Sequence, residues 1–544
     1  MNLRRRAPSL LLLAPVAALF AVFLLYPLQE ILRESFGRPG GLDPLFEDSY
    51  YLERAWFTTW QAMLSTVITL ALALPLAWLL ACHDFPGKRS LEALVMVPFV
   101  LPTIVVAVAF TALIGPSGVL NDLLVRFPGI DEPPIRLLNT LWAILIAHAF
   151  YNVALAARIV ATGWRGIDTN LEDSAAMLGA GPVARFTRVT LPLLRNSLLA
   201  AASLVFLFCF TSFGVVLILG GTGYSTIETE IYRESLFLFR LPVAGALAVL
   251  QMGVTFLAIV VNTSLQQAAA QRVEARRPAR FSRGSATGAA VVLAFIVVLT
   301  IAPMAALAER SFHAADGYTT RYYTLLDDNV RGQILFVAPI EAVRNSVTFA
   351  VAVTCLALPA GTIAAVAAVR LRSRAAEALI QAPLGVSAVT LGLGFLITFD
   401  SPPLNLRHSP VLIVIAHSMV AIPFVARTVA ARLRSIDPVL RDAAAMLGAG
   451  PLATFFRVDV PLLRGALVVG AVLSFAASMG EFGATLLISQ PEYPTIPVAI
   501  FRYLGQPGAV NYGQALAMAT ILMVVTAVAF FLVDRLAGRR AIEL

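Results

Sequence analysis

The chain has 544 residues, of which 59% are hydrophobic and 13% are charged, and its mean hydropathy is +0.82. A water-soluble protein could not bury so much apolar side chain, so the composition predicts an all-α protein that crosses a membrane many times. Although the net charge is +8, we predict no nucleic-acid partner, because no polar stretch is long enough to form a nucleic-acid-binding domain. The three cysteines have no CxxC or Cys/His spacing, so neither a disulfide framework nor a metal site is expected.

Windows of about 20 apolar residues are long enough to cross a bilayer as helices. Twelve such windows are expected, at 9–28, 57–82, 92–114, 138–162, 197–219, 241–266, 287–307, 341–369, 376–399, 409–432, 464–488 and 513–536. The windows at 92–114 and 376–399 are the weakest, because prolines interrupt them. The first window follows a basic start but runs too long for a signal peptide, so we expect a retained span.

The distribution of positive charge predicts the orientation. If the N-terminus is inside, 27 of the 40 Lys and Arg residues fall in inner segments or at their edges. Positive charge near the end of a span resists translocation. We therefore predict a multi-pass protein of the bacterial cytoplasmic (inner) membrane, in contact with the lipid bilayer and with both termini in the cytoplasm.

The chain contains one polar segment twice. Residues 167–195 and 436–464 are identical at 20 of 29 positions, and the repeat continues at the same offset of 269 to Ser212 and Glu481. We predict two six-span halves, 1–266 and 287–544, joined by a cytoplasmic linker at 267–286. Six spans return each half to the side where it began, so the repeats are parallel rather than inverted. Because the two polar loops have similar sequences, we predict that they are docking surfaces for two copies of one partner.

The sequence of each polar loop predicts a helical hairpin. An aspartate is placed to cap a first helix, and a glycine follows that helix where a left-handed C-cap is needed. A proline then opens a second short helix, which a further proline is expected to end. In chain order these residues are Asp168, Gly179, Pro182 and Pro192 in the first loop, and Asp437, Gly448, Pro451 and Pro461 in the second.

The two loops resemble the "EAA" coupling loop of ATP-binding-cassette (ABC) importer permeases, whose pattern is Glu-Ala-Ala, three residues, Gly, nine residues, then Ile-x-Leu-Pro. Aspartate replaces the glutamate in both copies. The matching residues are Asp173, Ala175, Gly179 and Pro192 in the coupling loop at 165–195, and Asp442, Ala444, Gly448 and Pro461 in the coupling loop at 434–464. In that family the loop sits in a cleft of the ATP-hydrolysing subunit and transmits its closure to the spans.

This resemblance implies a permease subunit of the type I ABC importer fold. The implied partners are two copies of a nucleotide-binding subunit and an extracytoplasmic substrate-binding protein. The chain's one lysine, Lys88, lacks the GxxxxGK[ST] spacing that cradles phosphates, and no HExxH or GxSxG motif is present. We therefore expect no enzymatic activity and no cofactor in this chain, with ATP bound and hydrolysed on a separate subunit.

The substrate is predicted from a finer resemblance. A single chain with two fused six-span halves resembles the permeases of ferric iron and thiamine importers, and the segments at 209–236 and 478–505 look most like those of thiamine permeases. Thiamine is the predicted substrate and ferric iron the alternative. A proton-coupled secondary transporter using His148, His417 and Glu481 is the rival from another class, although interior histidines more often bond a neighbouring helix.

Four residues are candidates for the pathway or gate. Tyr232 and Phe501 occupy matching positions in two outer segments, which we expect to form part of an outer gate or of a docking site; surface-lying amphipathic helices are the alternative. Ser212 and Glu481 also match each other. Glu481 either attracts a cation along the substrate path or caps backbone amides near Gly483.

Overall fold

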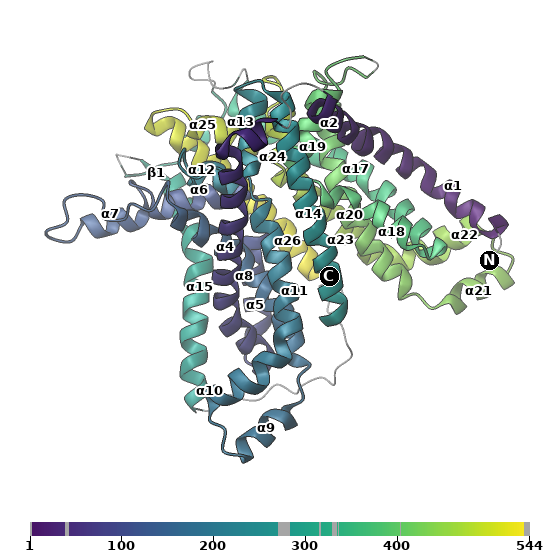
Figure 1. The fold of residues 1–544 in the computed structure, drawn as a ribbon, viewed down its shortest axis with the longest axis horizontal. Helices are drawn as coiled ribbons and strands as arrows, with labels where there is room; N and C mark the ends of the chain where they lie inside the picture. Colours follow the sequence, from purple (N-terminus) through teal and green to yellow (C-terminus); the bar gives the residue numbers. More distant parts are fainter. Residues whose placement is uncertain are drawn as a thin grey trace. The chain divides into compact units, whose positions relative to one another are not determined.

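The computed structural model describes residues 3–37, 43–269, 283–314, 317–328, 335, 337–402 and 404–537 (Figure 1). Most of the predicted linker, residues 270–282, lies outside the described residues. The described part is almost entirely helical, apart from an antiparallel pair of two-residue strands, β1 His313–Ala314 and β2 Gly317–Tyr318. This agrees with the predicted all-α class.

Before residue 270 the helices are α1 Leu3–Phe20, α2 Tyr26–Gly37, α3 Asp43–Glu47, α4 Ser49–Cys82, α5 Lys88–Val100, α6 Thr103–Ile114, α7 Val119–Val125, α8 Leu141–Arg165, α9 Thr169–Met177, α10 Pro182–Arg185, α11 Leu191–Phe210, α12 Gly214–Leu219, α13 Ile227–Leu236 and α14 Leu241–Ala269. After residue 282 they are α15 Arg283–Ser311, α16 Arg321–Thr324, α17 Pro339–Leu371, α18 Arg374–Gln381, α19 Ala388–Thr398, α20 Pro410–Arg434, α21 Pro438–Met446, α22 Pro451–Thr454, α23 Val460–Gly480, α24 Gly483–Ile488, α25 Ile496–Leu504 and α26 Ala509–Ala537. Short π-helical turns lie at Ala21–Leu25, Phe186–Thr190 and Phe455–Asp459, and a 3₁₀ turn lies at Ala382–Gly385.

Within the described residues, 11 helices are long and apolar enough to cross a membrane, or up to 12 if one bent pair counts as a span. That pair, Ala375–Gly385 and Ala388–Thr398, is bent by 88°. The other weak window, 92–114, is also broken, because α5 ends at Val100 and α6 begins at Thr103, just after Pro102. The prediction of about 12 spans is confirmed, and both windows interrupted by proline are divided.

The windows at 197–219 and 464–488 were expected to be continuous spans, and this expectation is wrong. Helix α11 ends at Phe210 and α12 starts at Gly214, whereas α23 ends at Gly480 and α24 starts at Gly483. The broken stretches contain Ser212 in one half and Glu481 in the other. Both candidate residues therefore lie at junctions between helices, where backbone N–H groups need capping.

The expectation that a proline ends the second helix of each polar loop is also wrong. Helix α10 continues through a π-helical turn into α11, and Leu191 N–H bonds to the carbonyl of Phe186 at that turn. Pro192 is therefore accommodated near the start of α11, where its missing N–H causes no helix break. The second copy repeats this arrangement around Pro461. Each loop's second helix is thus the base of a transmembrane helix.

The chain forms two compact units. One comprises residues 1–44, 231–249 and 311–544, and the other comprises 45–230 and 250–310. These packing units differ from the predicted halves, 1–266 and 287–544, because α1 and α2 belong with helices of the second half and most of α15 belongs with helices of the first. The halves describe the duplication of the sequence, and the units describe which helices pack together.

Helices α8 and α20 are the most enclosed spans of their respective units. Helix α8 packs against α4 and α11, and α20 packs in the corresponding way against α17 and α23. Small residues permit these close approaches. A Cβ atom at Gly361 of α17 would lie 2.6 Å from the Cβ of Val425 on α20. Each unit therefore has a three-helix core with a polar loop at one end of it.

Candidate functional site

Each polar loop begins with the predicted aspartate cap. The side chain of Asp168 accepts a hydrogen bond from Asn170 N–H at 2.9 Å, and that of Asp437 accepts one from Val439 N–H at 3.0 Å. These bonds satisfy N–H groups that have no partner inside α9 and α21. The two hairpins therefore start in the same way, as their matching sequences predicted.

The first helix of each loop ends in a Schellman motif. Gly179 has a φ of +85° and Gly448 a φ of +80°, which confirms the predicted left-handed cap. In the first loop, Ala180 N–H bonds to the carbonyl of Ala175 at 3.0 Å, and Gly179 N–H bonds to Ala176 at 2.9 Å. The equivalent bonds in the second loop run from Ala449 to Ala444 and from Gly448 to Ala445. This motif explains why both copies have a glycine directly after the last residue of the first helix's C-terminal turn.

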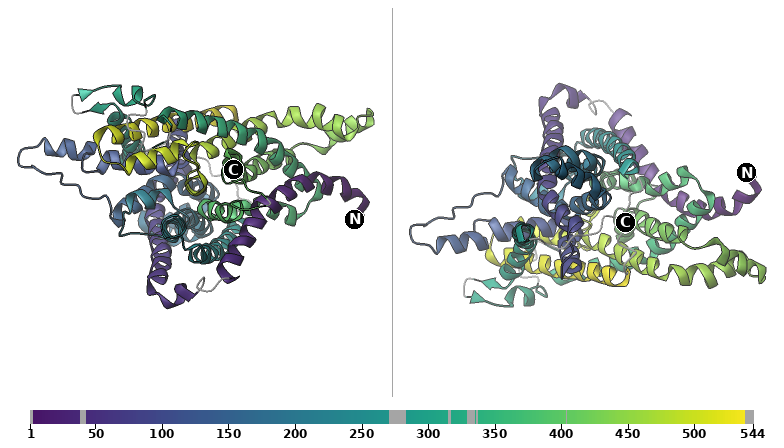
Figure 2. Two further views of the ribbon diagram at one scale, coloured as in Figure 1. Left: turned by 90° about the horizontal axis from the view of Figure 1, so that it is seen from above. Right: turned by 90° about the horizontal axis from the view of Figure 1, so that it is seen from below.

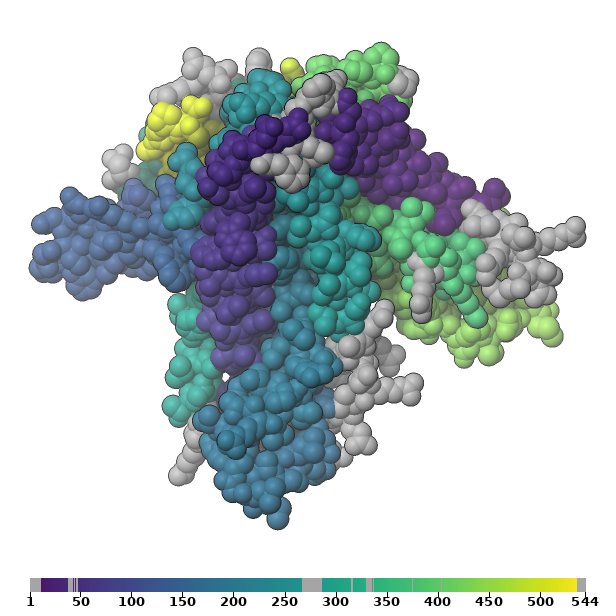
Figure 3. Space-filling view, in the orientation of Figure 1, coloured from purple at the N-terminus to yellow at the C-terminus, as the bar shows by residue number. Residues whose placement is uncertain are grey.

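Each hairpin presents two large apolar side chains to solvent at its tip. Met177 and Leu178 are 90% and 88% exposed, and Met446 and Leu447 are both 89% exposed. Helices α9 and α10 lie at the lower end of the α4, α8 and α11 bundle (Figures 1 and 3), and the α21–α22 segment forms an extremity of its own unit in both views of Figure 2. Exposed apolar groups that recur at equivalent sites indicate an interaction surface.

A polar contact fixes each first helix to the base of a transmembrane helix. In the first copy Thr190 Oγ1 donates to Glu172 Oε1 at 2.8 Å, and in the second Arg441 Nε donates to Asp459 Oδ1 at 2.8 Å. The positions are equivalent but the chemistry differs, since a hydroxyl–carboxylate bond is replaced by an ion pair. Sequence reasoning missed these contacts. The joint change of both positions between the copies was the signal that could have revealed them.

A second contact ties the end of the preceding span to a short helix. Arg165 Nη2 lies 3.3 Å from Glu92 Oε1 on α5, and Arg434 Nη2 pairs with Glu377 on α18. Arg165 also donates to the carbonyl of Leu80 at 3.1 Å. Both copies thus hold the entry to the hairpin by an equivalent arginine–glutamate pair.

The other matched loop residues lie on the surface. Asp173 and Asp442 are exposed near the middle of α9 and α21, and Pro192 and Pro461 are exposed near the base of α11 and α23. Ala175 and Ala444 are half-buried, and their carbonyls accept the Schellman bonds. The surface that could meet a partner is therefore formed by the aspartates and the Met-Leu tips.

Glu481 caps the helix that follows it. Its Oε1 accepts from Ala484 N–H at 2.8 Å, and its Oε2 accepts from Thr485 N–H at 3.0 Å and from the Thr485 hydroxyl. His417 Nε2 lies 2.7 Å from Thr485 Oγ1 and 3.2 Å from Glu481 Oε2, while its Nδ1 lies 2.8 Å from Ser478 Oγ. Because Thr485 donates to the carboxylate, its oxygen is free to accept from His417 Nε2–H. This arrangement corresponds to the capping alternative for Glu481.

The first half has a weaker version of this network. His148 Nδ1 lies 3.0 Å from Ser65 Oγ on α4. Ser212, which matches Glu481, is buried, and within the described residues its side chain makes no hydrogen bond. Both histidines bond a neighbouring helix as expected, but only the second half adds a carboxylate. Sequence reasoning found Glu481 and His417 but missed Ser478, which contacts His417, and Thr485, which contacts both.

The two matching segments that were predicted to lie on the outer side are packed among other helices. Ile227 N–H at the start of α13 donates to Thr58 Oγ1 at 3.0 Å, and Ile496 N–H at the start of α25 donates to Ser346 Oγ at 2.8 Å. Most residues of both helices are buried, so the alternative of surface-lying amphipathic helices is wrong. Burial also raises the pKa of Tyr232 to about 12, so its phenol stays neutral at physiological pH.

Tyr232 and Phe501 contact each other, with ring centroids 6.3 Å apart and nearly perpendicular planes. Phe501 also contacts Phe482, which directly follows Glu481, at 5.7 Å. The predicted gate residues Tyr232, Phe501 and Glu481 are thus brought close together in one compact unit. Ser212 belongs to the other unit.

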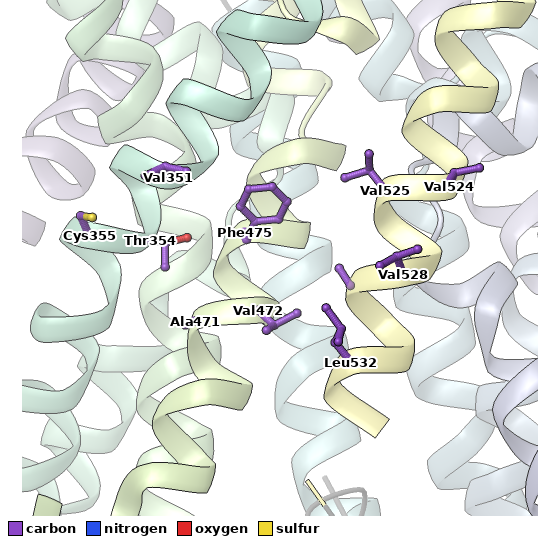
Figure 4. A pocket seen from close by; sticks show the side chains of 11 residues that line it. Val351, Thr354, Cys355, Ala471, Val472, Phe475, Val524, Val525, Val528 and Leu532 are labelled. Atoms are coloured by element: carbon purple, nitrogen blue, oxygen red, sulfur yellow. The ribbon is translucent and has the colours of Figure 1, made fainter. Parts of the chain in front are cut away.

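A cavity of about 520 Å³ lies among α17, α23 and α26 (Figure 4). Its lining is aliphatic and aromatic apart from Thr354 and Cys355, and the Thr354 hydroxyl donates to the carbonyl of Ala350 at 2.7 Å. This lining offers no charged side chain to a polar solute. The cavity therefore does not resemble a binding site for a cationic nutrient.

The sequence matches a known family over most of its length. The family described as "Binding-protein-dependent transport system inner membrane component" matches residues 59–312 and again residues 357–542. The thiamine transport system permease protein ThiP of Haemophilus influenzae is 29% identical over 488 residues, covering 88% of each chain. ThiP of Escherichia coli K12 is 24% identical over 511 residues, covering 91% of each chain.

Among solved structures, a bacterial ABC transporter that imports the acidic polysaccharide alginate aligns with a TM-score of 0.41 and 19% identity, covering 50% of this chain and 98% of that one. The family assignment does not depend on this alignment. It depends on the two family matches, which cover both polar loops and the broken fifth span of each half. The chain therefore belongs to the inner membrane components of binding-protein-dependent transport systems, as an ABC importer permease that carries the family domain twice.

Proposed function

We propose that this chain forms the transmembrane pathway of an ATP-driven thiamine importer. Two thiamine permeases are 29% and 24% identical to it and match about nine-tenths of its length, which includes both halves. Ferric iron is the alternative substrate. A secondary transporter driven by protons through His148, His417 and Glu481 is disfavoured, because the family couples transport to a binding protein.

The observation that carries the proposal is the pair of Met-Leu tips. Four large apolar side chains exposed to about 90% would be unfavourable in water unless a partner covers them. The two hairpins have the same caps, the same Schellman motif and the same exposed tip, so they suit two copies of one partner. We assign this partner as a nucleotide-binding subunit, which would bind and hydrolyse ATP.

The continuity of each hairpin with a span supports a mechanical role. Helices α10 and α22 run into α11 and α23 without a break, so a displacement of either hairpin would move the whole span. At the other end of α23 lie Glu481 and the aromatic contact of Phe482 with Phe501. We propose that ATP-driven closure of the partner subunits moves Tyr232 and Phe501, which act as the gate, with Glu481 and Ser212 at the breaks that allow the motion.

The remaining assignments follow from the same scheme. The hairpins and both termini would lie in the cytoplasm, and the α13 and α25 segments would lie toward the outer side of the inner membrane, where an extracytoplasmic binding protein delivers the solute. We propose no cofactor for this chain, because the energy for transport would come from ATP bound to the partner subunit.

Uptake into reconstituted vesicles tests the proposal. Vesicles containing this chain, its nucleotide-binding subunit and internal ATP should accumulate labelled thiamine only when the thiamine-loaded binding protein is outside. A protonophore should leave uptake unchanged. Uptake of ferric iron in place of thiamine would refute the substrate, and uptake driven by a proton gradient without ATP would refute the mechanism.

A further inference from the structure

The loop between α13 and α14 exposes an aromatic tip. Its sequence is Phe-Leu-Phe-Arg at 237–240, and Phe237 and Phe239 are 62% and 78% exposed. Along the chain, one span, α11, separates the α9–α10 hairpin from this loop, so the predicted topology puts the loop on the opposite side of the membrane from that hairpin. This tip is therefore on the side where the proposed function places the substrate-binding protein.

Phe239 has an unfavourable backbone conformation. Its φ is +53°, in the left-handed region that aromatic residues rarely adopt. The equivalent residue of the second half is Gly508, whose φ is +116°. The duplicated turn thus needs a positive φ, and the second half meets this need with the residue that adopts it most easily. The first half retains a bulky aromatic residue there and exposes it, which indicates that the side chain has a role outside the fold.

The difference between the halves indicates what covers the tip. The second half has Gln-Pro-Gly-Ala at 506–509 in place of Phe-Leu-Phe-Arg. The bilayer surrounds both halves alike, so an anchor for lipid would be expected in both. A single protein that docks across two similar halves must instead meet a different surface on each. Aromatic residues and arginine are also the types enriched at the centres of protein interfaces.

The tip is connected to the gate region by a series of ring contacts within one compact unit. Phe237 contacts Tyr232 with centroids 5.4 Å apart, Tyr232 contacts Phe501 at 6.3 Å, and Phe501 contacts Phe482 at 5.7 Å. Phe482 follows Glu481 at the break between α23 and α24. A displacement of the tip would therefore be transmitted by packed aromatic rings to the junction that Glu481 caps.

We propose that residues 237–240 form the docking tip for the substrate-binding protein, and that the ring series signals its arrival to the Glu481 junction. This inference rests on the proposed function. The partner surface should be an apolar pocket with an acidic side chain near Arg240, which is exposed at the base of the tip.

The Phe239→Gly variant tests the docking role without damaging the fold, because glycine removes the ring and also relieves the backbone strain. ATPase stimulation is measured in nanodiscs containing the full complex, with increasing amounts of thiamine-loaded binding protein. We expect the half-stimulating concentration to rise by about tenfold or more, with no decrease in the thermal unfolding midpoint. The control variant Phe127→Gly, which removes a 62% exposed ring from the loop after α7, should match the parent.

An unchanged half-stimulating concentration for Phe239→Gly would overturn the docking role. Quenching of a Phe239→Trp variant by brominated lipid, with no response to binding protein, would also overturn it and assign the tip to the membrane. For the ring series, Phe501→Leu should retain the half-stimulating concentration and lower the maximum stimulation several-fold; an unchanged maximum would overturn the relay. Failure of the parent complex itself to respond to the binding protein would instead refute the proposed function.

Discussion

Replacing Glu481 with glutamine distinguishes a structural carboxylate from one that attracts the substrate. Glutamine has nearly the same shape, but only one of its two terminal atoms can accept a hydrogen bond. The carboxylate accepts bonds at both oxygens, from Ala484 N–H at one and from the N–H and hydroxyl of Thr485 at the other. In either orientation of the amide, at least one buried backbone N–H loses its acceptor.

The size of the effect follows from these bonds. A hydrogen bond to a charged group contributes about 1.5–3 kcal/mol, and a buried donor left without a partner costs about 1–3 kcal/mol. The least damaging orientation keeps the oxygen toward Thr485 and loses only the bond from Ala484, so we expect a loss of about 2–3 kcal/mol in the free energy of unfolding. Ser212→Ala at the matching position should cost much less, because the Ser212 side chain makes no hydrogen bond within the described residues.

Equilibrium unfolding in mixed micelles measures this loss, and vesicle uptake of thiamine measures transport in parallel. The structural role predicts a large loss of stability, with any fall in transport accompanying it. A change in unfolding free energy below about 0.5 kcal/mol together with a strong fall in transport would refute the reasoning. That result would assign the carboxylate to the substrate path.

Three further predictions concern the loops and the energy source. Gly448→Val should destabilise the second hairpin by about 1–2 kcal/mol and lower ATPase coupling in the assembled complex, because a β-branched residue resists the φ of +80°. The control variant Gly450→Val changes a glycine whose φ is −67°, so it should couple normally. Equal coupling by the two variants would contradict the docking role of the hairpin. Arg441→Ala should weaken subunit assembly, because it leaves the buried Asp459 carboxylate without this partner. The double variant Arg441→Glu with Asp459→Thr copies the first-half pair and should restore assembly in a pull-down assay. Failure of the double variant to recover would contradict the role of this contact in fixing the hairpin to its span. The purified chain alone should neither bind nor hydrolyse ATP, and turnover by contaminant-free protein would exclude a passive permease subunit.

Features that depend on a few neighbouring residues could be predicted from the sequence. The caps at Asp168 and Asp437 and the left-handed glycines at 179 and 448 are set by contacts within about one helical turn, which the order of residues displays directly. The number of spans followed from apolar length, and the duplication followed from the repeated loop. These features needed no knowledge of how the helices pack.

The tertiary structure decided the features that join distant parts of the chain. Glu481 is a cap within a network to His417, which lies on another helix, and neither residue alone indicates this. The π-helical turn kept α10 continuous with α11 although Pro192 suggested a break, since the energy of a local irregularity depends on the packing around it. The first span of each half joined the other half's unit. An apolar window shows that a helix will be buried or in lipid, but the partner it packs against is chosen by shape complementarity between surfaces that are far apart in the sequence.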